Sequence, residues 1–145
     1  MVDFSTLLRT PAGHAKKPGA LPVDSYPAVI KSWEVGDNNK NKTPYVRFVI
    51  GLTDWPDGVS EEERQDNGEA IDLSKRQMRR DYYLTDDARW RLEELLAGCG
   101  LTLEGSTYEE LLPQMVGMSV VVEVQQYINQ QNNDIGNQVG KISPT

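Results

Sequence analysis

The sequence predicts a mainly β fold of the α+β class, in which two helices interrupt a series of five strands. Stretches in which apolar and polar side chains alternate recur along the chain, and such alternation is typical of half-buried strands. Between the third and the fourth of these stretches, two segments carry apolar residues at helical spacing behind helix-start signals. The expected strands are residues 26–35, 44–52, 75–84, 118–128 and 138–142.

The first two strands are expected to form a long hairpin. The segment between them, residues 36–43, consists of Gly, Asn, Asp, Lys and Thr, a composition typical of turns. Lys31 and Trp33 fall on the outward side of the first strand by parity. The side chains expected to face the core are Tyr26, Ala28 and Ile30 in the first strand and Val46, Phe48, Ile50 and Leu52 in the second.

The third strand contains one fault in its pattern. Met78, Tyr82 and Leu84 share the apolar parity, but Arg80 falls on that parity as well. Either a β-bulge or a position at the edge of the sheet would accommodate this arginine.

Two helices are expected within an insertion at about residues 85–117. The first begins at Thr85, a good N-cap residue, and the second begins at a capping box formed by Ser106 and Glu109. Trp90 lies opposite the apolar stripe of the first helix, and we expect it to pack against the second helix.

The predicted order of elements is strand, strand, strand, helical insertion, strand, strand. This order is that of the OB fold, whose helix lies between its third and fourth strands. We therefore expect an OB-type five-stranded barrel, since closure of a small barrel leaves no exposed strand edge.

The chain is expected to form one domain with an arm. Its length of 145 residues suits a single core. Residues 1–22 contain Pro, Gly and Lys in a composition that predicts an extended basic N-terminal arm, and residues 23–145 are expected to form the OB-type domain. Because no basic, apolar leader begins the chain and no run of about 18 apolar residues occurs, we expect a cytoplasmic protein with no membrane contact.

The net charge of −7 is distributed unevenly. Acidic side chains concentrate in residues 54–72 and 86–110, and the rest of the chain is net basic. Because salt screens charges beyond about 8 Å, a local basic surface can still bind a polyanion. The acidic segment 54–72 is expected to be a surface excursion, with Trp55 packed against the chain to hold it.

The outward side chains predict a surface for single-stranded nucleic acid. Such ligands are bound by cations along the phosphates and by aromatic rings that stack on the bases. Both kinds of side chain occur on the outward parity of the first three strands and in the loop between the first two. The candidate nucleic-acid-binding residues are Lys31, Trp33, Lys40, Lys42, Tyr45, Arg47, Lys75, Arg76, Arg79, Tyr83 and Tyr127.

Catalysis is not expected, and neither is a metal or another cofactor. With one cysteine, Cys99, and one histidine, His14, the chain has no Cys/His zinc set and no recognisable nucleophile with its base. A magnesium site formed by carboxylates such as Asp54, Asp57 and Asp72 is the enzymatic alternative, but acidic runs are usually solvated loops.

The chain resembles small bacteriophage OB-fold proteins that bind single-stranded DNA. The resemblance is carried by residues 21–30, by the segment 43–48 and by the block 78–92, and it covers most of residues 20–142. It implies coating of DNA in the host cell cytoplasm during phage replication or recombination, with no cofactor and no reaction. Mapped onto this sequence, it implies a binding face at Trp33, Tyr45, Arg47, Arg79 and Tyr83.

An alternative function from another class is an OB-like adaptor or structural phage protein that binds other proteins through its acidic surfaces. Many bacterial single-strand binders recruit partners through an acidic tail, whereas residues 140–145 here carry one lysine and no acid. The sequence is also compatible with weaker binding of RNA or duplex DNA and with self-association.

Overall fold

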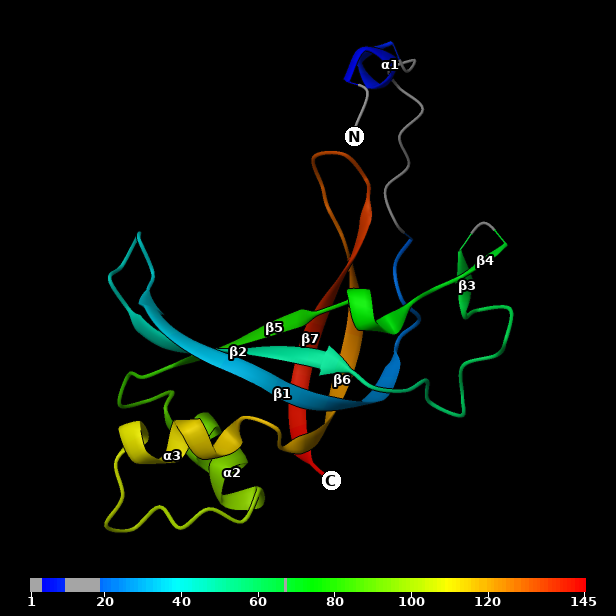
Figure 1. The fold of residues 1–145 in the computed structure, drawn as a ribbon. Coiled ribbons are helices and arrows are strands. Elements are labelled where there is room, and N and C mark those ends of the chain that lie inside the picture. Colours follow the sequence, from blue (N-terminus) through cyan, green and yellow to red (C-terminus); the bar gives the residue numbers. More distant parts are fainter. Residues whose placement is uncertain (1–3, 10–18, 67) are drawn as a thin grey trace.

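The computed structural model describes residues 4–9, 19–66 and 68–145, and Figure 1 shows the arrangement of their elements. The elements are α1 (Phe4–Leu8), β1 (Asp24–Asp37), β2 (Pro44–Leu52), β3 (Gln65–Asp66), β4 (Glu69–Ala70), the 3-10 helix η1 (Leu73–Lys75), β5 (Met78–Tyr83), α2 (Trp90–Gly98), α3 (Tyr108–Met115), β6 (Ser119–Ile128) and β7 (Ile135–Pro144).

A five-stranded antiparallel sheet dominates the fold. Its strand order is β5-β2-β1-β6-β7, and a separate two-stranded hairpin is formed by β3 and β4. The mainly β class and the two helices between the third and fourth long strands are therefore confirmed. The small hairpin was not predicted. The edge strands β5 and β7 approach each other, but within the described residues no ladder of backbone hydrogen bonds joins them.

One face of the sheet forms the core, and the predicted parities are confirmed for most of it. In β1 and β2, all seven side chains predicted to face the core are buried. The central residues Ile30, Phe48 and Val122 have no exposed surface. The buried core side chains of the long strands are Tyr26, Ala28, Ile30, Val46, Phe48, Ile50, Leu52, Met78, Tyr82, Val120, Val122, Val124 and Ile142.

Helices α2 and α3 follow β5 in the chain, and both pack on the sheet (Figure 1). Helix α2 contacts both β5 and β7, and α3 contacts β1. Their buried residues are Leu92, Leu95 and Leu96 in α2 and Leu111, Leu112 and Met115 in α3. Both helices begin later than predicted, because turns occupy residues 86–89 and because Thr107, not Ser106, accepts the capping hydrogen bond from the Glu110 amide at 3.3 Å.

A β-bulge in β1 reverses the expected side of Trp33. The pairing with β2 shifts between Ile30 and Ser32, so that Lys31 is the extra residue. After the bulge, Trp33 pairs with the fully buried Phe48 and packs against the core. The expectation that Trp33 shares the outward side with Lys31 is wrong, because one inserted residue exchanges the two faces of a strand.

Arg80 keeps the inner parity in an unbroken strand. No shift occurs in the pairing of β5 with β2, and Arg80 lies opposite Phe48. Because β5 is an edge strand, the guanidinium reaches out of the core, where it lies 5.0 Å from the centre of the Tyr82 ring. Of the two explanations that the sequence allowed, the edge position is therefore the one observed.

The first 22 residues are only partly described. Within the expected extended arm, Phe4–Leu8 forms the short helix α1, and residues 10–18 lie outside the described part of the chain. Leu21 belongs to the core, with 1% of its surface exposed. Its amide donates to Asn137 Oδ1 at 2.7 Å, and its carbonyl accepts from Asn137 and Gln126, so the chain is attached to β6 and β7 before β1 begins.

The acidic segment 54–72 is packed onto the domain at two points. The Trp55 ring lies 5.9 Å from the Tyr26 ring, as expected for a residue that holds the segment, and Val59 is buried. Arg64 donates to the carbonyls of Val59 and Pro56. In the part of the chain that the structure describes, no helix is long and apolar enough to cross a membrane.

Candidate nucleic-acid interface

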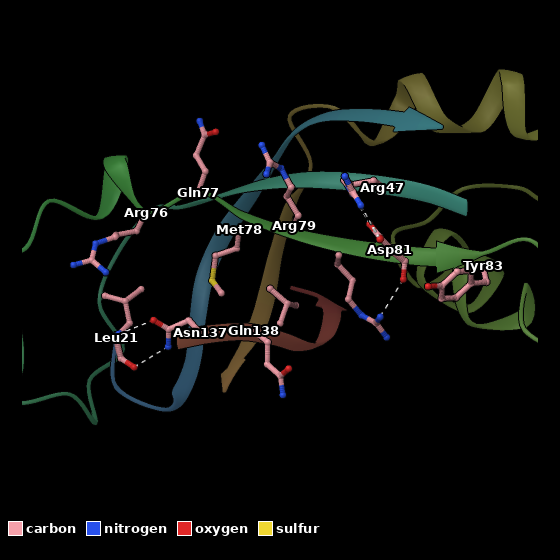
Figure 2. Close-up of a pocket in the computed structure, with 12 residues that line it drawn as sticks. Leu21, Arg47, Arg76, Gln77, Met78, Arg79, Asp81, Tyr83, Asn137 and Gln138 are labelled. Atoms are coloured by element: carbon pink, nitrogen blue, oxygen red, sulfur yellow. Dashed lines mark hydrogen bonds and ion pairs between the residues drawn. The ribbon is translucent and has the colours of Figure 1, made fainter. Parts of the chain in front are cut away.

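A groove of about 720 Å³ runs along the space between β5 and β7. We call it the seam groove. Figure 2 shows Arg76 near one end and Tyr83 near the other, with Asn137 and Gln138 across the groove on β7. Its lining residues are Leu21, Arg47, Arg76, Gln77, Met78, Arg79, Arg80, Asp81, Tyr83, Asn137, Gln138 and Val139.

The seam groove is basic although the protein is acidic. Four arginines and one aspartate line it, so its side chains carry a net positive charge within a chain of net charge −7. Arg79 is exposed, and among the described residues its guanidinium has no hydrogen-bond or ion-pair partner. An unpaired guanidinium binds a phosphate without first breaking another contact.

Arg47, in contrast, is already engaged. Its Nε donates to Asp81 Oδ1 at 2.6 Å and its Nη2 donates to Asp81 Oδ2 at 3.0 Å, while Nη1 lies 3.7 Å from a Glu34 carboxylate oxygen. The hydrogen bond with Asp81 raises the pKa of the Arg47 guanidinium above its ordinary value. A phosphate at this position must therefore compete with Asp81 for Arg47.

Two tyrosines flank this ion pair on the outward side of the sheet. Tyr45 and Tyr83 pair across β2 and β5, with ring centres 6.3 Å apart in an edge-to-face arrangement. The Arg47 guanidinium lies 5.0 Å from the centre of the Tyr45 ring. Tyr83 is 39% exposed and lines the seam groove, so its ring presents a surface on which a base can stack.

The Arg76 end of the groove leads into a second hollow with acidic walls. Arg76 Nη1 donates to the Gly19 carbonyl at 2.7 Å, which fixes the side chain at this junction. Asp66, Glu69 and Asp72 line the hollow beyond it together with Lys75. Two hydrogen bonds from Ser74 lower the pKa of Asp72, which favours the charged carboxylate. Lys75 therefore lies among carboxylates, a setting less favourable for a phosphate than that of Arg79.

The remaining sequence candidates do not line the seam groove. Lys31 is exposed on the outward face, where its side chain crosses Gly51. Lys40 and Lys42 lie exposed in the loop between β1 and β2. Tyr127 is 47% exposed, and its ring lies against Gly136 on the hairpin of β6 and β7. Of the eleven candidates, Arg47, Arg76, Arg79 and Tyr83 meet in the groove, and Tyr45 borders it.

The groove also contains residues that the sequence did not indicate. Arg80 is one of them, although an arginine on an apolar parity is itself a signal of a special environment. Asn137 and Gln138 belong to β7, and nothing in their local sequence predicts that β7 faces β5.

Within residues 4–9, 19–66 and 68–145, no three His, Cys, Asp or Glu side chains lie close enough to hold a metal ion together. Cys99 is half-buried, and burial raises the pKa of its thiol, which disfavours the nucleophilic thiolate. His14 lies outside the described residues.

No protein-family model matches the sequence, and a comparison with the curated proteins finds no match. The site is therefore defined by its own geometry, a basic groove between two sheet edges that contains the ion pair of Arg47 and Asp81, the exposed Arg79 and the exposed Tyr83.

Proposed function

We propose that this protein binds single-stranded DNA in the seam groove, with arginines on the phosphates and tyrosines stacked on the bases. The observation that supports this most directly is the gathering of Arg47, Arg76, Arg79 and Arg80 in one groove of an otherwise acidic protein. Like charges repel one another, so four guanidiniums along one groove are most readily explained by an anionic ligand.

The groove suits a single strand better than a duplex. Unpaired bases expose their faces, and each base stacked on an aromatic ring contributes about 1–3 kcal/mol. Tyr83 offers such a ring in the groove, and Tyr45 lies next to it. We propose binding largely without sequence preference, because stacking on an aromatic ring accepts any base.

We further propose that the sheet forms an OB-type barrel whose β5 and β7 edges meet at the seam groove. The strand order β5-β2-β1-β6-β7 and the insertion of α2 and α3 between β5 and β6 both support this assignment. The approach of the two edges supports it as well. We propose that the protein coats DNA during phage replication or recombination in the host cytoplasm, as the resemblance in the sequence implies.

Titration of a fluorescent oligo-dT at low and at higher salt, with a matched duplex alongside, tests the proposal. We expect tight binding to the single strand, weaker binding to the duplex, and a loss of affinity with salt of about 0.7 in log K per phosphate contact per decade. Absence of binding at low salt would contradict the proposal. It would favour the adaptor function, in which acidic surfaces such as segment 54–72 bind another protein.

A further inference from the structure

A second hollow lies at the far end of the seam groove, between β5, α2 and β7. Its volume is about 510 Å³. We call it the α2 compartment, and its lining includes Arg80, Tyr82, Trp90, Arg91, Lys141 and Pro144. None of the sequence candidates for nucleic-acid binding lies in it, so it is a separate feature of the surface.

Arg80 connects the α2 compartment to the seam groove, because its side chain lines both hollows. Helix α2 packs across the same two edge strands, β5 and β7, that border the seam groove. A strand that follows the seam groove past Arg80 therefore reaches the α2 compartment without leaving the surface of the protein.

Trp90 exposes an aromatic ring at this place. It is the first residue of α2, and 53% of its surface is exposed. The sequence predicts that it packs against the second helix, but the structure instead places it in the wall of the α2 compartment, with the Arg91 guanidinium 5.2 Å from its ring centre. An exposed tryptophan beside cations is the combination that stacks a base and attracts its phosphate.

The cations of the α2 compartment have spare hydrogen-bonding capacity. Arg80 Nη1 donates to the Asp81 carbonyl at 3.0 Å, and its Nε is buried without a partner among the described residues, so a phosphate meets this guanidinium through its outer nitrogens. Lys141 is exposed and has no ion-pair partner there either. The lining contains one acidic side chain, Glu94, and three basic side chains, those of Arg80, Arg91 and Lys141. The compartment is therefore net basic.

We infer that the α2 compartment is an end subsite for the single strand, in which one nucleotide stacks its base on Trp90 and its phosphate contacts Arg80 and Lys141. This assignment rests on the function proposed above. The subsite extends the path of the strand beyond the seam groove. An oligonucleotide must therefore be long enough to reach it before the protein binds with full affinity.

A length series of oligo-dT tests this, from about 4 to 16 nucleotides, the range that single OB folds cover. We expect Trp90→Ala to weaken binding of the longer oligonucleotides roughly 5- to 100-fold, the loss of one stacked base, and to leave the shortest unchanged. Trp90→Phe should restore much of the affinity, because phenylalanine keeps a stacking face. Lys141→Gln should also weaken binding of the longer oligonucleotides, and the affinity of this variant should depend less steeply on salt.

Val116→Ala is the matched control, since Val116 is 48% exposed at the end of α3 and does not line the compartment. If Trp90→Ala and Lys141→Gln bind every length as the unmodified protein does, the end subsite is overturned. The proposed function would survive that result, provided that the unmodified protein binds oligo-dT and that Arg79→Ala weakens this binding. If the unmodified protein does not bind oligo-dT, both proposals fail together.

Discussion

Arg47 and Asp81 lie directly opposite each other on β2 and β5 and form a two-point hydrogen-bonded ion pair, with Arg47 Nε 2.6 Å from Asp81 Oδ1. The side chains of both residues are about 30% exposed. The pair links the edge strand to its neighbour and at the same time occupies an arginine that faces the seam groove. It therefore stabilises the sheet and reduces the positive charge that the groove offers to an anionic ligand.

Asp81→Asn is expected to tighten binding of single-stranded DNA about 3- to 10-fold at low salt, because it frees Arg47 and removes the acidic side chain of the groove. The free energy of unfolding should fall by about 0.5–1 kcal/mol through loss of the ion pair. Oligo-dT titration and urea denaturation measure the two effects. Unchanged or weaker binding by this variant would show that Arg47 does not contact the phosphates.

Arg79→Ala should weaken binding about 3- to 10-fold and reduce the salt dependence of log K by about 0.7 for one lost contact. Its stability should be nearly unchanged, because Arg79 is exposed and, within the described residues, unpaired. Arg89→Ala is the control, since it removes the same charge from an exposed site outside the seam groove. Equal effects of the two variants would mean that overall charge, not the groove, governs binding.

Trp33→Ala should lower the free energy of unfolding by about 2 kcal/mol, because the bulge at Lys31 turns this side chain toward Phe48 and the core. Tyr83→Ala should show the opposite behaviour, with weaker DNA binding and a smaller loss of stability, since Tyr83 is exposed. Denaturation curves and oligo-dT titration on both variants make the comparison. Weakened binding by a fully stable Trp33→Ala protein would contradict the inward placement.

The stability of the protein should fall above about pH 10. Burial raises the pKa of Tyr82 from 10.0 to about 12, and burial likewise raises the pKa of Tyr26 to about 12. Below pH 10 both tyrosines are neutral in the folded and unfolded states. Between pH 10 and 12 the unfolded chain releases their protons first, so each tyrosine lowers the free energy of unfolding by up to about 1.4 kcal/mol per pH unit.

Tyr82→Phe tests this dependence, because it removes one of the two titrating groups and keeps the ring that packs on Phe48. Urea denaturation at pH 8 and at pH 11 should show a smaller difference for this variant than for the unmodified protein. An identical difference in both proteins would mean that Tyr82 does not contribute to the alkaline loss of stability.

Short-range pattern was sufficient to predict the five long strands, the helices α2 and α3, and most of the core. The alternation in residues 44–52 placed Val46, Phe48 and Ile50 on the buried side. This works because a strand that is buried on one face needs apolar side chains at every second position. The same alternation predicted that Arg79 and Tyr83 point outward, which made them candidates for binding.

The candidate site depended on contacts between residues far apart in the chain, which local pattern does not encode. The bulge that turned Trp33 inward appears only when β1 pairs with β2, and the fault at Arg80 was resolved only by the place of β5 at the sheet edge. The partner of Arg47 was likewise set by the register of β2 against β5. The alternation of side chains thus specified most of the buried residues, whereas strand pairing and the approach of β5 to β7 decided which charged and aromatic residues share one groove.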